Sequence, residues 1–443
     1  MNTPVYTSRF GKENLTLLTD FYELTMANGF FQDGRADQTA YFDMFFRRIP
    51  DGGGLAIMAG VAQVIEYLEN LSFTEEDIEY LRSKSLFSEE FLDYLRHFRF
   101  ACDVWAVPEG TPIFPHEPIV TVRGPVVQAQ FIETMILLAV NHQTLIACTI
   151  ADREFDIPAL GTMAHSWVQL FDSELDAFRV YAREYPQSCT LLVDTYSTLK
   201  SGIPNAIRVF NEELLPRGFR PKGVRIDSGD ITYLSKKARK MLDEAGFPDC
   251  KITASNSLDE YIIRDMIQQG ACVDSFGVGE RMITAASDPV FGGVYKLAAV
   301  EIDGKIVPRI KVSENVTKIT NPCFKKLWRL YDRESGKAIA DVMTLRDEVI
   351  DDTRPYVLFD PEHIWKRKTV ENFQAKELQV PLFLNGKKVY ESPDIETIRA
   401  YCAEQIDTMW DEVLRFENPH RYYVDLSQPL WDEKQRLLCE YGG

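Results

Sequence analysis

The chain has 443 residues, 45% of them hydrophobic and 12% aromatic, and a formal net charge of −18. Its length exceeds what one ordinary core accommodates, so we expect two or three domains, and its acidity excludes non-specific nucleic-acid binding. Neither a membrane span of ~20 apolar residues nor a signal-peptide core is visible, and the eight scattered cysteines form no zinc or disulfide pattern, so a cytoplasmic protein is expected.

The first 125 residues mix helices and strands. The apolar spacing of 17–31 predicts a helix, with Thr19 and Asp20 where an N-cap belongs. The other expected elements are an aromatic strand at 39–50, a glycine turn at 51–60, two acidic helices within 74–99 and short β-rich pieces over 104–125. We interpret residues 1–125 as an N-terminal α+β domain.

A different pattern begins at Val126, where residues 126–147 are typical of one long apolar helix. Short apolar strands then alternate with amphipathic helices. The expected strands are 189–194, 223–227, 251–255, 272–279 and 294–300, and the expected helices are 203–215, 231–246 and 258–270. This alternation predicts a catalytic α/β domain over residues 126–320, with a parallel sheet or barrel built from right-handed crossovers.

The last part of the chain, residues 321–443, is less regular. Residues 328–343 and 380–390 are typical of hairpins with glycine turns, and acidic helices close the chain. We interpret this part as a smaller C-terminal α+β portion that packs on the N-terminal domain.

Polar residues recur directly after the expected parallel strands, at the edge where α/β proteins place their active sites. His165 follows a further candidate strand at 156–162. The other strand-end segments are Asp194-Thr195-Tyr196, Arg225 to Asp230 (RIDSGD), Ser255-Asn256-Ser257 and Gly277-Val278-Gly279. Because these segments share one geometric level, the set is more informative than any single motif.

Each segment also has a purely structural explanation. A lone histidine after a strand is commonly a hydrogen-bonded structural residue. RIDSGD could be an aspartate helix cap with a turn. Gly277–Gly279 could be a simple turn, since the following Glu280 repels phosphate. Both interpretations stay open for each segment taken alone.

Together the segments have a chemical logic. Asp194, Asp227 and Asp230 offer the oxygen ligands that Mg²⁺ prefers, and Arg225 offers a fork for carboxylate or phosphate. Backbone amides of Gly277–Gly279 can cradle a phosphate, and a neutral histidine can act as a base or a nucleophile. Metal, arginine and amides are what an acidic protein needs to hold an anionic sugar phosphate.

Motifs over most of the chain resemble those of the nicotinate phosphoribosyltransferase family, which consists of type II phosphoribosyltransferases. In chain order they are TDFYELTM, YFDMFFRRIPDGGGLAIMAG, GTMAHSW, LVDTY, GVRIDSGD, YKLAAV and VDLSQPLWD. GTMAHSW and VRIDSGD in this order are specific signals. The resemblance implies an enzyme that joins nicotinate to phosphoribosyl pyrophosphate, giving nicotinate mononucleotide and pyrophosphate, coupled to ATP hydrolysis in a homodimer with shared active sites.

The resemblance also implies roles for individual residues. In the family the histidine of GTMAHS is transiently phosphorylated, so His165 becomes the expected phosphohistidine and Thr162 is expected near nicotinate. Tyr22 is implied to contact nicotinate from the neighbouring subunit. Arg225 is implied to pair with the nicotinate or phosphoribosyl anion.

The remaining implied residues hold the sugar phosphate. Asp194 and Asp227 are implied to order the ribose and Mg²⁺. Gly277, Gly279 and Thr284 are implied to form the 5′-phosphate end of the site, where some relatives carry threonine in place of Glu280. The other expected substrate-binding residues are Tyr196, Ser228, Gly229, Ser255 and Asn256.

One segment of the family pattern is absent. Relatives continue after the helix ending NHQTLIA with a strand bearing a Gly-Ser/Thr-Arg-Arg-Ala-Gln-like motif and another helix, whereas here Ala147 is followed directly by Cys148. About 45 residues, the size of one βα unit, are therefore missing. The resemblance then predicts an irregular, incomplete α/β barrel with two unpaired edges.

Two classes of function remain after this comparison. One is a working ligase-type enzyme, and the other is a non-catalytic or impaired relative that dimerises and binds phosphoribosyl pyrophosphate without turnover. The retained His165, Arg225 and Asp227 favour the enzyme, whereas the missing arginine pair favours the second class. Nicotinamide in place of nicotinate also stays open. A quinolinate phosphoribosyltransferase is disfavoured, because that family resembles shorter chains without the GTMAHS histidine.

Overall fold

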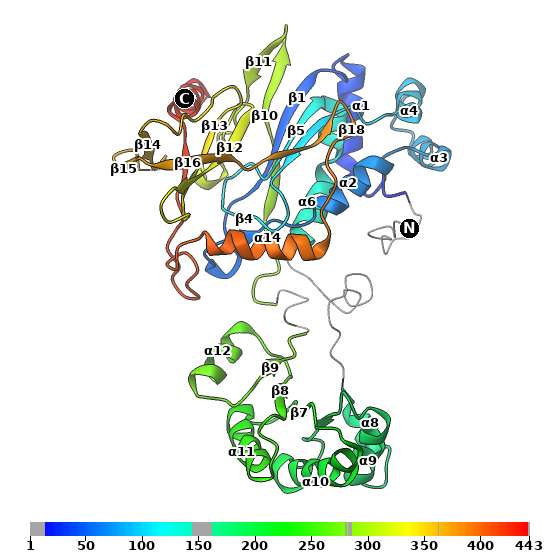
Figure 1. Cartoon of the computed structure of the whole chain (residues 1–443). Coiled ribbons are helices and arrows are strands. Elements are labelled where there is room, and N and C mark those ends of the chain that lie inside the picture. The colour runs from blue at the N-terminus through cyan, green and yellow to red at the C-terminus, as the bar shows by residue number, and fades with distance from the viewer. Residues whose placement is uncertain (1–13, 144–161, 280, 282–285, 362, 442–443) are drawn as a thin grey trace. The chain divides into compact units, whose positions relative to one another are not determined.

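The computed structural model describes residues 14–143, 162–279, 281, 286–361 and 363–441. The chain divides into two compact units, which are coloured by residue number in Figure 1. Unit 1 comprises residues 1–145 and 288–443, and unit 2 comprises residues 146–287. This division places residues 126–143 and 288–320 with unit 1, where the sequence had predicted one domain over 126–320. The junction between Ala147 and Cys148 lies outside the described residues.

Unit 1 is built on a seven-stranded sheet, and the predicted aromatic segment forms one of its interior strands. That strand, β1 (Thr39–Phe46), is buried and pairs antiparallel with β10 (Gly293–Ile302) and with β5 (Val120–Pro125). The sheet is completed by β11 (Lys305–Pro308), β3 (Asp103–Ala106), β17 (Val380–Leu384) and β18 (Lys387–Lys388). The strand predicted at 294–300 for the parallel sheet is therefore β10 of this antiparallel sheet, because its apolar residues pair with those of β1.

The helices of the N-terminal part contribute side chains to the same core as this sheet. They are α1 (Phe21–Gln32), α2 (Val61–Asn70), α3 (Glu75–Ser83), α4 (Glu89–Arg96), α5 (Val126–Phe131) and α6 (Glu133–Gln143). The first of the two predicted acidic helices, α3, begins with a capping box formed by Thr74 and Asp77. The single long helix expected from residue 126 is wrong in one respect. It is interrupted at Ile132, which ends α5.

A second, four-stranded sheet belongs to the C-terminal part of unit 1. Its strands are β16 (Phe373–Glu377), β12 (Lys325–Asp332), β13 (Ala338–Leu345) and β19 (Val424–Leu426). The remaining elements of unit 1 are the hairpin of β14 (Tyr356–Phe359) and β15 (Arg367–Val370), the pair of β2 (Ala56–Ile57) and β4 (Pro112–Ile113), α14 (Ile395–Asp407), α15 (Gln428–Tyr441) and the turns η1 (Pro50–Gly52) and η5 (Val316–Lys318). The N-terminal and C-terminal parts of unit 1 are joined through Arg329 of β12, whose guanidinium donates to Pro112 O at 2.8 Å.

Unit 2 contains a parallel sheet with strand order β6 (Thr190–Leu192), β7 (Gly223–Ile226), β8 (Lys251–Ala254) and β9 (Ser275–Phe276). Its helical elements are α8 (His165–Gln169), α9 (Glu174–Glu184), η2 (Thr198–Gly202), α10 (Ile203–Val209), η3 (Phe210–Leu214), η4 (Leu215–Arg217), α11 (Ile231–Glu244) and α12 (Glu260–Gln268). Leu191, Val224 and Ile252 are fully buried in its core. The predicted α/β class is confirmed, although the sheet stays open among the described residues.

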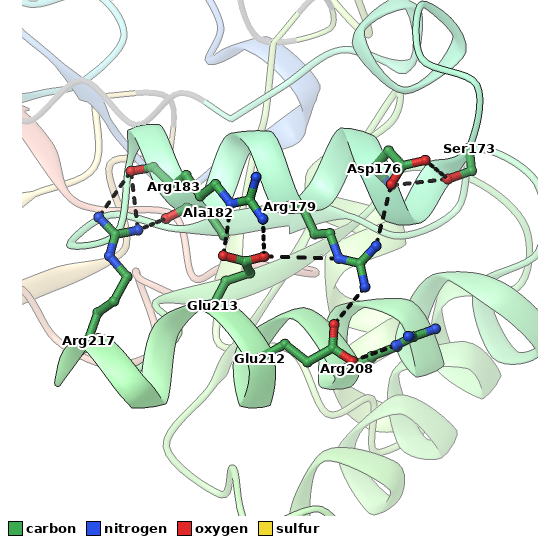
Figure 2. A network of polar contacts seen from close by, with 9 residues as sticks. All are labelled: Ser173, Asp176, Arg179, Ala182, Arg183, Arg208, Glu212, Glu213 and Arg217. Carbon is green, nitrogen blue, oxygen red and sulfur yellow. Dashed lines mark hydrogen bonds and ion pairs between the residues drawn. The ribbon is translucent and has the colours of Figure 1, made fainter.

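A network of ion pairs fastens α9 to the helical turns after α10 (Figure 2). Arg183 holds Glu213 with two hydrogen bonds, of 2.9 Å and 2.5 Å. Arg179 donates to Glu212 at 2.7 Å, and Arg208 donates to the other oxygen of the same carboxylate at 2.7 Å. No helix within the described ranges combines the length and apolarity needed to cross a membrane.

Candidate functional site

The candidate site of unit 2 lies at the carboxyl ends of three neighbouring strands. β6, β7 and β8 run parallel, with Leu192 opposite Arg225 and Ile226 opposite Ala254. The residues that follow them therefore come together, as the sequence predicted for a parallel sheet. Gly202 of η2 supports this edge, because a Cβ there would lie 1.8 Å from Val193 O. Only glycine lets η2 approach the end of β6 so closely.

Arg225 donates hydrogen bonds to three other side chains of the site. Its Nε donates to Ser255 Oγ at 2.7 Å, its Nη1 to Thr162 Oγ1 at 3.2 Å and its Nη2 to Asp227 Oδ1 at 2.7 Å. All three guanidinium nitrogens are thus engaged with protein groups that come from three separate segments. The predicted pairing of Arg225 with a substrate anion stays a prediction, and the structure adds a second role, which is to hold Thr162, Asp227 and Ser255 in place.

Asp227 is ionised in this environment. Partial burial opposes the charge, but hydrogen bonds from Ser255 and Arg225 and the positive charge of Arg225 hold the pKa of Asp227 below its usual range. Ser255 is shared, because its hydroxyl donates to Asp227 Oδ1 while its oxygen accepts from Arg225. The carboxylate is therefore a fixed negative charge at the centre of the site.

His165 lies against this carboxylate. It is the first residue of α8, and its Nε2 lies 3.6 Å from Asp227 Oδ2. Its Nδ1 lies 3.1 Å from Thr195 Oγ1. The imidazole is 38% exposed, so a ligand can reach it. The sequence had placed Thr195 in the strand-end segment Asp194-Thr195-Tyr196 and in the LVDTY motif, but had predicted no individual role for it.

Asp194 carries an oxygen that is free to bind something else. Its Oδ2 accepts from the backbone N–H of Asp227 at 2.9 Å and from Ser228 Oγ at 2.6 Å. Its Oδ1 is buried and has no hydrogen-bond partner among the described residues. A buried carboxylate oxygen without a partner is unfavourable. It fits either a hard cation such as Mg²⁺ or a ligand hydroxyl.

The predicted metal ligands do not form a complete protein cage. Asp230 caps α11 by accepting from the backbone N–H of Tyr233 at 2.9 Å, which is the structural alternative for RIDSGD. Among the described residues no three His, Cys, Asp or Glu side chains converge on one metal position. Mg²⁺ commonly binds through one or two carboxylates and substrate phosphates, so Asp194 and Asp227 remain candidates.

Two predicted residues at the same edge have unusual backbone conformations. Asn256, after β8, has φ of 95°, and Gly229, before α11, has φ of 79°. Left-handed backbone is costly for a residue other than glycine, and such strain gathers at functional sites. Gly277 lies close to Ser255, since a Cβ at position 277 would be 3.3 Å from Ser255 Cβ.

The structure assigns no role to four other predicted residues. Tyr196 is 62% exposed beside it, and Gly279 is exposed after β9. Thr284 lies outside the described residues. Tyr22 belongs to α1 of unit 1, where its side chain is exposed. The roles predicted for these four residues stay predictions.

A histidine, an arginine and two carboxylates meet at the carboxyl edge of a parallel sheet, so this is an α/β protein with a candidate active site where such folds place it. Family models match almost the whole described chain. They are the nicotinate phosphoribosyltransferase N-terminal domain at residues 17–141, the nicotinate phosphoribosyltransferase family at 138–344 and the nicotinate phosphoribosyltransferase C-terminal domain at 324–434. The chain belongs to the nicotinate phosphoribosyltransferase family.

Individual relatives agree with this assignment. The nicotinate phosphoribosyltransferase of Bacillus subtilis is 40% identical, with 97% of this chain and 96% of the relative covered, and the human one is 28% identical, with 94% and 95% covered. The crystal structure of human nicotinic acid phosphoribosyltransferase superposes with a TM-score of 0.80 at 25% identity, covering 96% of this chain and all of that one. A nicotinate-nucleotide pyrophosphorylase from Pyrococcus furiosus shares the fold, with a TM-score of 0.63 at 19% identity and 88% and 94% covered.

The length of the match with the Bacillus subtilis protein is consistent with a missing segment in this chain. It extends over 476 positions with the Bacillus subtilis protein, which is more than the 443 residues of this chain. The relative therefore contains residues that have no counterpart here. This length difference has the direction expected from an absent βα unit.

Proposed function

We propose that this protein transfers the phosphoribosyl group of phosphoribosyl pyrophosphate to nicotinate, and that a phosphohistidine at His165 couples the transfer to ATP hydrolysis. The observation that carries the proposal is the contact between His165 and the ionised Asp227, at the edge where Asp194 and Arg225 also meet. Membership of the family supplies the substrates.

The transfer step is a displacement at the ribose. The ring nitrogen of nicotinate forms a bond to ribose C1 while the bond from C1 to the pyrophosphate oxygen breaks, and pyrophosphate leaves with the electron pair. The ribose ring becomes positively charged on the way. Asp194 and Asp227 present carboxylate charge at the same edge, which favours such a state over the neutral sugar. Arg225 keeps Asp227 and Thr162 oriented during the step.

The coupling step uses His165. An imidazole nitrogen with a free lone pair attacks the γ-phosphorus of ATP, the bond from that phosphorus to the bridging oxygen breaks, and ADP leaves. Water later cleaves the N–P bond and returns histidine and phosphate. Asp227 stabilises the imidazole as its positive charge develops, because an opposite charge lies 3.6 Å from Nε2.

Mg²⁺ fits the donor set of this site. The buried Asp194 Oδ1 is a hard oxygen donor without a partner among the described residues, and Asp227 lies beside it through its backbone N–H. When bound, the cation would neutralise charge on the leaving pyrophosphate. We further propose a cytoplasmic homodimer in which the partner subunit's Tyr22 contacts nicotinate.

Because a segment of the family pattern is absent, the alternative to a working enzyme is a non-catalytic relative. A relative that binds phosphoribosyl pyrophosphate without turnover would retain the fold but not the chemistry. The working enzyme is favoured by the intact hydrogen-bond network around Arg225, because this network joins three segments and nothing in folding alone requires an ionised Asp227 beside an exposed histidine.

The deciding experiment measures labelled nicotinate mononucleotide made by the purified chain from nicotinate, phosphoribosyl pyrophosphate and Mg²⁺, with and without ATP. Product that ATP stimulates is the expected result. Product without ATP stimulation would remove the coupling role of His165. A folded protein that makes no product would overturn the proposal in favour of the non-catalytic class. Nicotinamide in place of nicotinate tests the choice of base.

A further inference from the structure

A groove of unit 1 lies apart from every predicted site residue. It has a volume of about 790 Å³ and is lined by the turn after β12, by β15 and by the loop between α14 and β19. Small-molecule sites commonly have volumes of roughly 300–1,000 Å³, so this groove is large enough for a small ligand. We call it the aromatic groove, because Trp410, His420 and Tyr423 are among its lining residues.

These three aromatic side chains come from the same loop. Trp410 is 44% exposed and Tyr423 is 49% exposed. The His420 ring meets the Tyr423 ring edge-on, at a centroid distance of 5.6 Å. The electron-rich faces of tryptophan and tyrosine attract cations, and tryptophan does so most strongly. The rings therefore favour a ligand that is both apolar and positively charged.

The protein holds this aromatic wall in place. The indole N–H of Trp410 donates to Ala338 O at 2.7 Å. The backbone N–H of His420 donates to Glu412 O at 2.7 Å, which closes the loop, and Val413 inside the loop is buried. Because the polar end of the indole is already bonded, its exposed face is available to a ligand. A wall that is formed in advance spares the ligand the cost of ordering it.

The charges of the groove also favour a cation. Four carboxylates line it, those of Asp332, Glu334, Glu371 and Glu412, against one lysine, Lys368. The side chains of Glu334 and Glu371 make no hydrogen bond or ion pair with any other residue that the structure describes. Their charges are therefore available to a ligand, and an anionic ligand would be repelled.

A coordinated metal ion does not fit this lining. Within the described part of the chain no three His, Cys, Asp or Glu side chains converge on one metal position. An organic cation satisfies both features of the groove, because its apolar surface packs on the rings while its charge faces the carboxylates. We propose that the aromatic groove binds a small organic cation of the quaternary ammonium or pyridinium kind. The inference is independent of the proposed function, since it uses no residue of the site in unit 2.

The test is calorimetric titration of the full chain with choline and, separately, with N-methylpyridinium at low ionic strength. Each cation is paired with an uncharged analogue of the same shape. For choline this analogue carries a tert-butyl group in place of trimethylammonium, and for N-methylpyridinium it is toluene. We expect a dissociation constant of about 1 mM for the preferred cation and at least about tenfold weaker binding of its analogue.

The comparison of the two cations identifies the class of ligand. Tighter binding of choline would assign the groove to quaternary ammonium compounds, and tighter binding of N-methylpyridinium would assign it to flat pyridinium compounds. Binding of neither cation would overturn the proposal. Equal affinity for a cation and its uncharged analogue would overturn it as well, because the groove would then recognise only apolar surface.

Two variants locate the binding site. Tyr423→Ala removes one ring, and Glu371→Lys reverses one charge at the rim. Each should weaken cation binding about fivefold. The same substitutions at exposed positions outside the groove, Tyr441→Ala and Glu404→Lys, are the matched controls and should keep the wild-type affinity. Wild-type affinity in both groove variants would overturn the proposal. If Tyr423→Ala does not fold, Glu371→Lys decides alone, because its side chain is exposed.

Discussion

Arg225 Nη2 lies 2.7 Å from Asp227 Oδ1. Arg225 lies in β7 and Asp227 directly follows it, so the two side chains lie on the same side of the strand at its carboxyl end. This pair links the strand to the rest of the site, because Arg225 also reaches Thr162 and Ser255, and Asp227 also faces His165. The guanidinium fork therefore organises the site from within. Lysine at this position would keep the charge but not the fork.

We accordingly expect Arg225→Lys to lower kcat/KM for nicotinate mononucleotide formation by roughly 10- to 100-fold, the equivalent of one lost charge-assisted hydrogen bond. Steady-state kinetics at saturating ATP measure the effect. Arg220→Lys is the control, since Arg220 pairs with Asp249 at the surface. A wild-type kcat/KM in Arg225→Lys would show that the three-way contact does not matter for turnover.

His165→Ala should abolish ATP stimulation while a slow ATP-independent transfer remains, because only the phosphoryl acceptor is lost. Incubation with γ-labelled ATP should give an acid-labile label on the wild type and none on the variant. His142→Ala, at the end of α6, controls for loss of another histidine. Equal ATP stimulation in His165→Ala would remove the phosphohistidine from the mechanism.

Chelation should stop product formation, and Mg²⁺ should restore it. In Asp194→Asn the carboxamide oxygen still accepts from Asp227 and Ser228, but the cation loses a charged ligand. The Mg²⁺ concentration for half-maximal rate should then rise by about 10-fold or more. Asp249→Asn is the matched surface control. The same Mg²⁺ requirement in Asp194→Asn and the wild type would place the metal elsewhere.

Glu23 makes the stability of unit 1 depend on pH. Burial in α1, reinforced by Glu133 and opposed by Gln130, raises the pKa of Glu23 to about 7. The unfolded chain releases this proton near the ordinary value of 4.5. The stabilising contribution is therefore complete below pH 4.5 and is lost as the pH rises to about 7.

Glu23→Gln cannot ionise, so its free energy of unfolding does not fall as the pH rises. Relative to the wild type, the free energy of unfolding of the variant should therefore rise between pH 4.5 and 7, by up to about 3 kcal/mol at about 1.4 kcal/mol per pKa unit. Melting curves over pH 4 to 8, with the exposed Glu76→Gln as control, measure the difference. A difference that does not change with pH would contradict the raised pKa.

The buried pair of Arg329 and Asp341 should dominate the stability of the C-terminal sheet. Both side chains are fully buried, and Arg329 bonds Asp341 with two hydrogen bonds of 2.7 Å and 2.6 Å. Arg329→Met leaves an unpaired buried carboxylate and should cost about 3–5 kcal/mol in denaturant unfolding. Arg399→Ala, in an exposed pair with Glu396, should change stability by less than about 1 kcal/mol. Equal effects would show that burial of the pair is irrelevant.

The sequence was sufficient for the α/β class, the family and most of the strand-end residues. Parallel strands bring their carboxyl ends to one edge, so the strand pattern alone was enough to group Asp194, Arg225, Asp227 and Ser255. It was insufficient for the strand at 294–300, because a short, mostly apolar run predicts a strand but not whether its partner runs parallel or antiparallel. Its pairing with β1 depends on contacts about 250 positions away in the chain.

The sequence alone thus determined which polar residue types follow each expected strand and at what spacing, since motif chemistry and strand periodicity are local properties. The tertiary structure decided what each side chain does. It joined Arg225 to three protein groups, assigned Asp230 to a helix cap, left Asp194 Oδ1 without a partner among the described residues and set Thr195 against His165. The physical reason is that hydrogen bonds extend only about 3 Å, and only folding brings residues 30 or more positions apart within that distance.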